Sequence, residues 1–298
     1  MRAAPVLAHA SGGAAADQTF EFGAADFERV RRLIHRHAGI ALNPSKESMV
    51  YSRLSRRVRA LGKPDFRSYL DALEATPAGG GEWQAFTNAL TTNLTAFYRE
   101  QHHFPILAEH IAGQARRGPV KLWSCAVSTG EEACTMAITA MEALQSRAPR
   151  VSILGTDIDT EVLDTARCGV YPEDTVGKVD KDILKRYFLR GRGDRAGMVR
   201  VQRDVLALIE YRALNLLEAR WPIETRFDAI FCRNLMIYFD KDTQYRVLQG
   251  LAARLQPDGL LFAGHSENFS HARDLFELQG RTVYRLAATR RLAARASA

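Results

Sequence analysis

Acidic residues follow two apolar segments of the chain, at the points where a nucleotide-like ligand would be bound. Residues 120–123 are strand-like, and a turn of small residues leads through Gly130 into a helical pattern that opens with Glu131 and Glu132. Strand, tight turn and helix form a unit in which backbone N–H groups face a ligand. A second apolar run ends at Asp157, which is placed to accept hydrogen bonds from ribose hydroxyls. The spacing therefore predicts a ligand that contains a ribose.

The glycine content of the turn separates two kinds of ligand. A dinucleotide fold needs G-x-G-x-x-G so that the backbone can approach a pyrophosphate, whereas this turn has only Gly130 and two acids that would repel one. Acids suit a cationic ligand with an amino group and a sulfonium, so we expect S-adenosylmethionine rather than NAD. Glu131 by itself is explained by the helix dipole, which favours an acid in the first turn. At least one acid of the pair is expected to bind the ligand together with Asp157.

The elements that must position these residues alternate between strand and helix. Further strand-like runs occupy residues 227–232, 260–264 and 282–286, and a helical pattern occupies residues 241–255. Such alternation predicts a parallel sheet with helices on both faces and a ligand at the carboxyl ends of its strands. Glycines also separate short apolar segments farther upstream, which predicts a small antiparallel β-subdomain inserted at about residues 187–214.

A small all-helical domain is predicted before the sheet, over residues 19–90. Apolar residues recur there every three or four positions, with glycine or proline between the repeats. The second of its helices carries a run of arginines without interspersed acids: Arg53, Arg56, Arg57 and Arg59. This run is either a basic patch for an acidic partner or an ordinary solvated face, and the sequence leaves both open.

Composition restricts the class of protein. The 298 residues are 46% hydrophobic and 25% charged, which is ordinary for a globular protein, and the net charge of +7 indicates an acidic partner without naming it. The four cysteines form no C-x-x-C pair, which favours a reduced protein. The chain has no apolar run of membrane-spanning length and no signal-peptide pattern. We therefore expect a cytoplasmic protein that does not insert into a membrane.

Five segments, taken in order, resemble one family, the chemotaxis receptor glutamate methyltransferases of the CheR type. They are NLTAFYRE at residues 93–100, STGEEA at 128–133, DIDTEVL at 157–163, FDAIFCRNLMIYFDK at 227–241 and GLLFAGHSENF at 259–269. The resemblance runs from about Phe20 to Leu286. It implies a Rossmann-like S-adenosylmethionine-dependent methyltransferase sheet with the small inserted antiparallel β-subdomain, preceded by the all-α domain.

The resemblance also implies an activity, the transfer of a methyl group from S-adenosylmethionine to glutamate side chains on the cytoplasmic helices of chemotaxis receptors. The products are methyl esters and S-adenosylhomocysteine. A glutamate carboxylate has an ordinary pKa of about 4.3 and is ionised at neutral pH, so no general base is required. The enzyme must instead hold the reacting groups in line and exclude water.

Individual site residues follow from the same resemblance. Asp157 is expected at the ribose, Glu132 at the charged amino end or the nearby ribose, and Asn215 at the adenine edge. Arg99 is expected either to engage the cofactor carboxylate or to steer the incoming glutamate, and Tyr238 to position the substrate carboxylate. Arg99 and Tyr238 are thus the implied catalytic residues. The full set of implied cofactor contacts is Asn93, Thr95, Arg99, Glu132, Asp157, Asn215, Leu216, Arg233 and Asn234.

Receptor recognition is expected at two places. Arg53, Arg56, Arg57 and Arg59 offer charge complementary to acidic methylation helices. The loop with Gly191, Gly193 and Gly197 resembles that of family members which bind the C-terminal pentapeptide of a receptor as an additional strand. A plain surface hairpin is the alternative for this loop.

Boundaries and partners complete the prediction. We expect a disordered tail at 1–18, the helical domain at 19–90, a linker at 91–99 that contributes to the cofactor site, the methyltransferase domain at 100–288 and a basic tail at 289–298. We expect a monomer without a nucleic-acid partner. No metal is expected, because His102 and His103 lack further ligands at suitable spacing and are assigned to a helix surface.

Three other functions are weaker. A nucleic-acid amino-group methylase would need an Asn-Pro-Pro-Tyr-like motif after a strand, and the sequence has none. A non-catalytic S-adenosylmethionine-binding module is consistent with the fold alone, but Arg99 and Tyr238 speak against it. A dehydrogenase fails on the glycine pattern.

Overall fold

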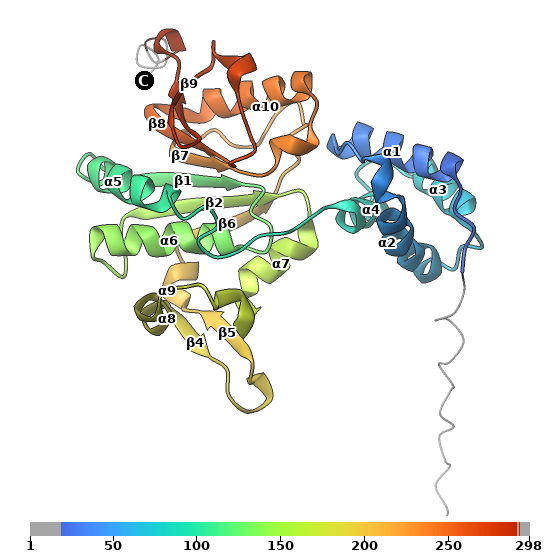
Figure 1. Cartoon of the computed structure of the whole chain (residues 1–298), viewed down its shortest axis with the longest axis horizontal. Helices are drawn as coiled ribbons and strands as arrows, with labels where there is room; N and C mark the ends of the chain where they lie inside the picture. The colour runs from blue at the N-terminus through green and yellow to red at the C-terminus, as the bar shows by residue number, and fades with distance from the viewer. Residues whose placement is uncertain (1–18, 291, 293–298) are drawn as a thin grey trace, which may run out of the picture. The chain divides into compact units, whose positions relative to one another are not determined.

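The computed structural model describes residues 19–290 and 292 (Figure 1). Contacts divide them into two compact units, residues 19–33 with 43–90, and residues 34–42 with the remainder from 91 onward. The sequence instead places 34–42 in the helical domain. The predicted tail at 1–18 and most of the predicted tail at 289–298 lie outside the described residues. Of the helices described, none is both long and apolar enough to cross a membrane.

The first unit is helical, as the apolar spacing predicts. Its helices are α1 (Ala24–Ala38, whose last residues group with the second unit), the 3-10 turn η1 (Pro44–Lys46), α2 (Glu47–Ala60), α3 (Phe66–Ala75) and α4 (Gly81–Leu90). Asn43 caps η1 by accepting from the backbone N–H of Ser45, and Asp65 caps α3 by accepting from that of Ser68. Val50, Leu54 and Val58 form the buried stripe of α2.

The second unit is built on a seven-stranded sheet with the order β6-β2-β1-β7-β8-β10-β9. The five strands from β6 to β8 pair in parallel. They are β1 (Val120–Cys125), β2 (Val151–Asp157), β6 (Ile209–Ala213), β7 (Phe227–Cys232) and β8 (Leu255–Ala263). Their carboxyl ends therefore meet at one edge of the sheet, where a ligand of this fold is bound.

Helices cover both faces of this sheet (Figure 1). On one face α5 (His103–Ala115) and α6 (Glu131–Leu144) pack on Leu122, Ile153 and Phe231, and α7 (Thr160–Cys168) contributes Leu163 to the same core. On the other face α10 (Lys241–Arg254) packs on Trp123 and Ile230. Residues with apolar side chains alternate between these two cores along each strand, because neighbouring side chains of a strand point to opposite faces.

The last two strands depart from the predicted parallel arrangement and make the sheet mixed. β10 (Val283–Leu286) pairs antiparallel with β8 and with β9 (Phe276–Gly280), a strand that the sequence did not reveal. Arg281 and Thr282 join β9 to β10 with φ of 50° and 58°, as a two-residue hairpin turn requires. Between β8 and β9 the only regular element is the short turn η5 (Ser270–Ala272), whereas a parallel neighbour needs a long crossover.

A second, three-stranded antiparallel sheet has the order β3-β5-β4. Its strands are β3 (Val170–Pro172), β4 (Phe188–Arg190) and β5 (Met198–Val201), and the short helical segments around them are η2 (Glu173–Val176), α8 (Lys181–Tyr187), η3 (Gly193–Arg195) and α9 (Arg203–Leu206). The predicted limits of 187–214 are therefore wrong at both ends. β3 lies upstream of them, and residues 209–213 form β6, whose register with residues 153–157 of β2 makes it part of the large sheet.

Candidate functional site

The loop between β1 and α6 has an uncommon backbone. Ala126, Ser128 and Gly130 have φ of 84°, 51° and 99°, and the first two are not glycines. Such conformations persist where the surroundings fix them, and they cluster at functional sites. Here the backbone N–H groups of Ala126 and Val127 both donate to the carbonyl of Thr156. A Cβ at Gly130 would lie 2.8 Å from the Cβ of Ala166, so only glycine fits at the start of α6.

Asp157 holds this loop in place from the end of β2. Its Oδ2 accepts from the backbone N–H of Ser128 at 2.8 Å and its Oδ1 from that of Asp159 at 2.9 Å. Burial raises the pKa of Asp157 to about 6, although the two backbone donors oppose the shift. Each oxygen retains a lone pair, so the carboxylate can also accept two hydroxyl groups of a ligand.

Asn93 is brought to the same place by Asp159. Asp159 caps α7, and its Oδ2 accepts from Thr91 Oγ1 at 2.6 Å and from Asn93 Nδ2 at 2.8 Å. The carbonyl of Asn93 in turn accepts from Ser128 Oγ at 2.9 Å. The segment before α5 is thus tied to both loops of the ligand edge, and Thr95 lies half-buried next to it. Asp159 is part of the motif DIDTEVL, but its linking role was not predicted.

Glu132, in the first turn of α6, and Arg233, directly after β7, form a largely buried ion pair. Glu132 Oε2 lies 3.2 Å from Arg233 Nη1, and its Oε1 accepts from Ser124 Oγ at 2.7 Å. Burial raises the pKa of Glu132, and the charge of Arg233 opposes this. The side chain of Arg233 is 1% exposed, and its guanidinium lies over the ring of Phe231. The opposite charge of each group partly offsets the cost of removing the other from water.

Arg99, Asn215 and Tyr238 also belong to this unit. Arg99 Nη1 donates to the carbonyl of Leu94 at 2.8 Å, and the backbone carbonyl of Arg99 accepts from Arg233 Nη2. After β6, Asn215 Nδ2 donates to the carbonyl of His37 at 2.8 Å, and Leu216 is half-buried beside it. Tyr238 is half-buried in the turn η4 (Met236–Tyr238) after β7.

Glu267 is a structural carboxylate that the sequence reading missed. It is 5% exposed and accepts from the backbone N–H groups of Asn234, Leu235 and Met236 after β7 and of Gly264 after β8. Asn234 has a φ of 58°, so its conformation depends on such support. The sequence signal for this role was that Glu267, an acid within the GHSENF segment, has no basic residue next to it in the chain.

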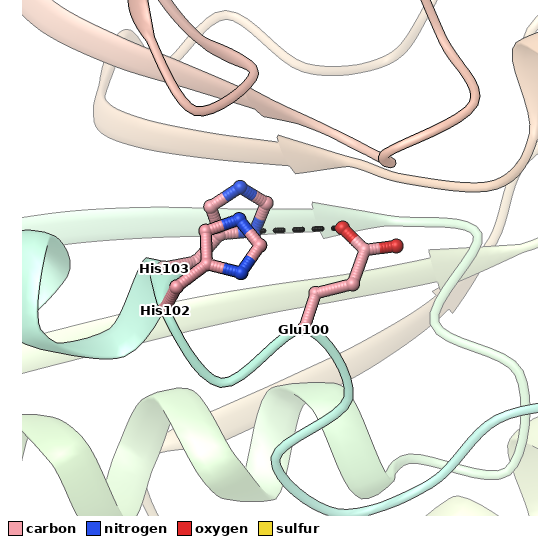
Figure 2. Close-up of side chains that lie close together, drawn as sticks. All are labelled: Glu100, His102 and His103. Carbon is pink, nitrogen blue, oxygen red and sulfur yellow. Dashed lines mark ion pairs between the residues drawn. The ribbon is translucent and has the colours of Figure 1, made fainter.

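The predicted surface position of His103 is wrong. This residue is fully buried, and its Nε2 lies 3.0 Å from the carbonyl of Arg281, which can only accept. Nε2 therefore carries the proton, and Nδ1 presents a lone pair toward Glu100 Oε2 at 3.8 Å (Figure 2). Burial and the charge of Arg233 lower the pKa of His103 to about 4, so the ring is neutral at pH 7.

Glu100, His102 and His103 are the one group of potential metal ligands found among the described residues (Figure 2). A guanidinium nitrogen of Arg233 lies 3.6 Å from Glu100 Oε2. A fixed positive charge so close to the proposed oxygen ligand disfavours a cation. The group is better described as a polar network around the backbone of Arg99.

Two family models cover most of the chain. Residues 93–285 match the CheR methyltransferase SAM-binding domain, and residues 25–91 match the CheR methyltransferase all-alpha domain. The chain belongs to the CheR methyltransferase family. The family, the fold class and the cofactor expected from the sequence are thereby confirmed, and S-adenosylmethionine is the methyl donor of this enzyme.

Several relatives are similar to this chain over nearly their whole length. Chemotaxis protein methyltransferase 2 of Pseudomonas aeruginosa is 52% identical over 269 residues, which cover 90% of this chain and 95% of the relative. The chemotaxis protein methyltransferase of Salmonella typhimurium is 52% identical over 88% of this chain and 90% of its own length. That of Escherichia coli is 49% identical over 88% and 91%. The chain is therefore a chemotaxis protein methyltransferase.

The arginines proposed to recognise the receptor belong to α2 of the first unit and not to the loops that follow the sheet strands. Arg57 Nε donates to Glu82 Oε1 at 3.2 Å, Arg53 Nη1 donates to the carbonyl of Ala89, and Arg59 lies over the ring of Phe20. Of the four arginines in α2, Arg56 alone is exposed. Most of the predicted basic patch thus also stabilises the helical unit.

The glycine loop lies between β4 and β5 of the small sheet. Gly193 and Gly197 have φ of 57° and 80°. Gly191 does not have a positive φ and is needed for a different reason: a Cβ there would lie 1.9 Å from the carbonyl oxygen of Arg195.

Proposed function

We propose that this methyltransferase esterifies glutamate side chains on the cytoplasmic helices of chemotaxis receptors. The main support is that the chain is about half identical in sequence to chemotaxis protein methyltransferases over most of its length. The proposed reaction also needs no general base in the site. A glutamate carboxylate is already ionised at neutral pH, so the protein has only to position it behind the sulfonium methyl group. We further propose that the enzyme acts in the cytoplasm as a monomer.

The proposed roles of the side chains are consistent with their surroundings. Asp157 accepts the ribose hydroxyls with its remaining lone pairs. Glu132 interacts with the cofactor's charged amino end or with the nearby ribose, and Arg233 supplies the opposite charge beside it. Arg99 engages the cofactor carboxylate or steers the substrate, and Tyr238 positions the substrate carboxylate. The other proposed contacts, which line the cofactor, are Asn93, Thr95, Asn215, Leu216 and Asn234.

The activity is tested with radiolabelled S-adenosylmethionine and membranes that contain a chemotaxis receptor. We expect methyl label on the receptor that is released as methanol by mild base, since carboxyl methyl esters are base-labile. Receptor in which the modified glutamates are replaced by alanine is the control and should remain unlabelled. Base-stable label on the receptor would contradict the proposal. Light scattering of the purified enzyme tests whether it is a monomer in solution.

Receptor binding through α2 is proposed to depend chiefly on Arg56. It is exposed, whereas Arg57 is engaged by Glu82 at the surface of the same unit. Charge complementarity mainly increases the association rate and is weakened by salt. This makes Arg56 the arginine of the run whose charge is best placed to meet an acidic helix.

A receptor tether at the small sheet is also proposed. β4 is at an edge of the sheet, and Leu189 on it is 54% exposed. A C-terminal receptor peptide with aromatic residues would add as a strand to the small sheet, which raises the local concentration of enzyme. The alternative to a tether is a plain surface hairpin whose glycines serve only its turns.

The tether is tested by calorimetry with a free receptor peptide that contains Trp and Phe near its C-terminus. We expect micromolar binding by the wild type and by Gly193→Asn, since asparagine tolerates the left-handed backbone. Binding should be lost in Gly193→Val, because a β-branched residue resists a φ of 57°. Absence of binding by the wild type would leave only the plain hairpin.

A further inference from the structure

Glu100 connects three segments that are distant in sequence. Its Oε1 accepts from His265 Nδ1 at 3.0 Å, from the backbone N–H of His265 at 3.3 Å and from Asn234 Nδ2 at 3.4 Å. Its Oε2 lies 3.6 Å from Arg233 Nη2. The carboxylate therefore links the segment before α5 to the loops that follow β7 and β8, and its side chain is only 9% exposed.

The segment that Glu100 anchors carries Arg99 in a strained turn. Tyr98 and Glu100, on either side of Arg99, have φ of 56° and 52°. Neither residue is a glycine, and two left-handed residues so close together persist only when other contacts fix them. Besides its own backbone hydrogen bonds, this turn is held by Arg233, which donates to the carbonyl of Arg99, and by Thr135 Oγ1, which accepts from the backbone N–H of Tyr98. The side chain of Glu100 provides the remaining connection to the loops after β7 and β8.

The contacts of Glu100 are directed at the protein. His265 and Asn234 supply its donors, and the neutral His103 ring behind it presents a lone pair at 3.8 Å (Figure 2). His103 thus offers Glu100 no donor, which leaves the donors from the β7 and β8 loops to set its orientation. If the hydrogen bonds from His265 and Asn234 to Glu100 were lost, the turn that carries Arg99 would no longer be attached to the loops after β7 and β8.

We propose that Glu100 is a positioning residue for methyl transfer, which holds the turn of Arg99 against the loops after β7 and β8. The proposal rests on the proposed role of Arg99 at the site. Glu100 acts through Arg99, and its function is to keep the guanidinium where the cofactor and the incoming glutamate meet. Misplacement of a positioned group by about 1 Å can lower turnover on the order of a hundredfold.

The test compares Glu100→Ala, Glu100→Gln and wild type in receptor methylation, with S-adenosylhomocysteine affinity and thermal midpoint measured in parallel. We expect Glu100→Ala to lower kcat at least about tenfold, while the affinity for S-adenosylhomocysteine changes by less than about threefold. Glu100→Gln keeps an acceptor oxygen for His265 and Asn234, so it should recover most of kcat. A role in stability alone would lower the thermal midpoint and leave kcat at permissive temperature unchanged, which would overturn the proposal.

A double-mutant cycle with His265 provides a second measure. His265→Ala removes the ring donor to Glu100 and keeps the backbone donor. Because the removed donor acts through Glu100, His265→Ala should add little to the loss of kcat in Glu100→Ala. Multiplication of the two losses would contradict the proposed connection.

Arg99→Ala separates the two levels of the argument. Unchanged turnover in Arg99→Ala would refute the role of Arg99. Loss of turnover in Arg99→Ala with full turnover in Glu100→Ala would refute the positioning role alone.

Discussion

Replacement of Asp157 by asparagine tests the ribose assignment most directly. The substitution keeps the shape of the side chain but leaves one acceptor oxygen in place of two. In the wild type one oxygen accepts from the backbone N–H of Ser128 and the other from that of Asp159. The asparagine NH2 group must therefore face one of these donors, and the remaining oxygen must serve both the loop and the ligand.

The expected loss of affinity follows from the number of acceptors. A hydrogen bond to an ionised group contributes about 1.5–3 kcal/mol. Loss of at least one ribose hydrogen bond of this kind, about 2 kcal/mol, weakens S-adenosylhomocysteine roughly thirtyfold. A backbone donor left without its acceptor adds a stability loss of about 1–3 kcal/mol, so the thermal midpoint should also fall.

The pKa of Asp157 gives this prediction a pH signature. Burial raises the pKa to about 6 from an ordinary 3.8, so in the free protein the carboxyl group becomes protonated below pH 6. Affinity for the cofactor should fall as the pH decreases through 6, by about tenfold per pH unit, because ribose binding requires the ionised form. The stability of the free protein changes in the opposite direction. The contribution of Asp157 is fully present below pH 3.8 and is lost as the pH rises through 6.

Isothermal titration with S-adenosylhomocysteine between pH 5 and 8 measures both effects. Asp228→Asn is the matched control, since Asp228 is a partly buried acid near the amino end of β7 that accepts from the backbone N–H of Lys121. It should bind the ligand like the wild type, whereas Asp157→Asn should bind weakly and without the drop near pH 6. The ribose assignment would be refuted if Asp157→Asn bound S-adenosylhomocysteine as tightly as the wild type, or if Asp157→Asn showed the same pH profile as the wild type.

Three further substitutions address the neighbouring groups. Tyr238→Phe should lower kcat at least about tenfold with little change in S-adenosylhomocysteine affinity, measured by steady-state kinetics and calorimetry; equal losses in both would indicate packing instead. Arg56→Glu should raise the receptor KM and reduce the salt dependence of KM without changing the thermal midpoint. Arg57→Glu should also lower the thermal midpoint, because it breaks the pair of Arg57 with Glu82. Identical behaviour of the two variants in a salt series would contradict the separate role proposed for Arg56. Glu132→Gln removes the nearer of the two carboxylates beside the buried Arg233 and leaves only Glu100 at 3.6 Å, so unfolding in urea should show a loss of about 3 kcal/mol, and an unchanged midpoint concentration would be inconsistent with the ion pair.

Much of the fold is written in local patterns, and these were readable from the sequence. The strand, turn and helix around Gly130, the acid at the end of β2 and the order of the family motifs depend on neighbouring residues alone. The cap of α3 by Asp65 is equally local, because its side chain reaches only three residues along the chain, but it was not predicted. Local propensity and hydrophobic spacing therefore predicted the fold class, the acids and the single glycine of the turn indicated the cofactor, and the resemblance of the motifs indicated the family.

The tertiary structure decided everything that depends on which strands are neighbours. Residues 209–213 look like part of the hairpins in sequence, but pairing with β2 places them in the large sheet. Glu267 binds backbone groups up to 33 residues away, and His103 is buried by contacts 178 residues away. A sequence pattern does not specify such partners, since they become adjacent only when the strands between them have paired. The polar network around Arg99 exists for the same reason: Glu100 meets Asn234 and His265 together because β7 and β8, which precede these two residues, end side by side.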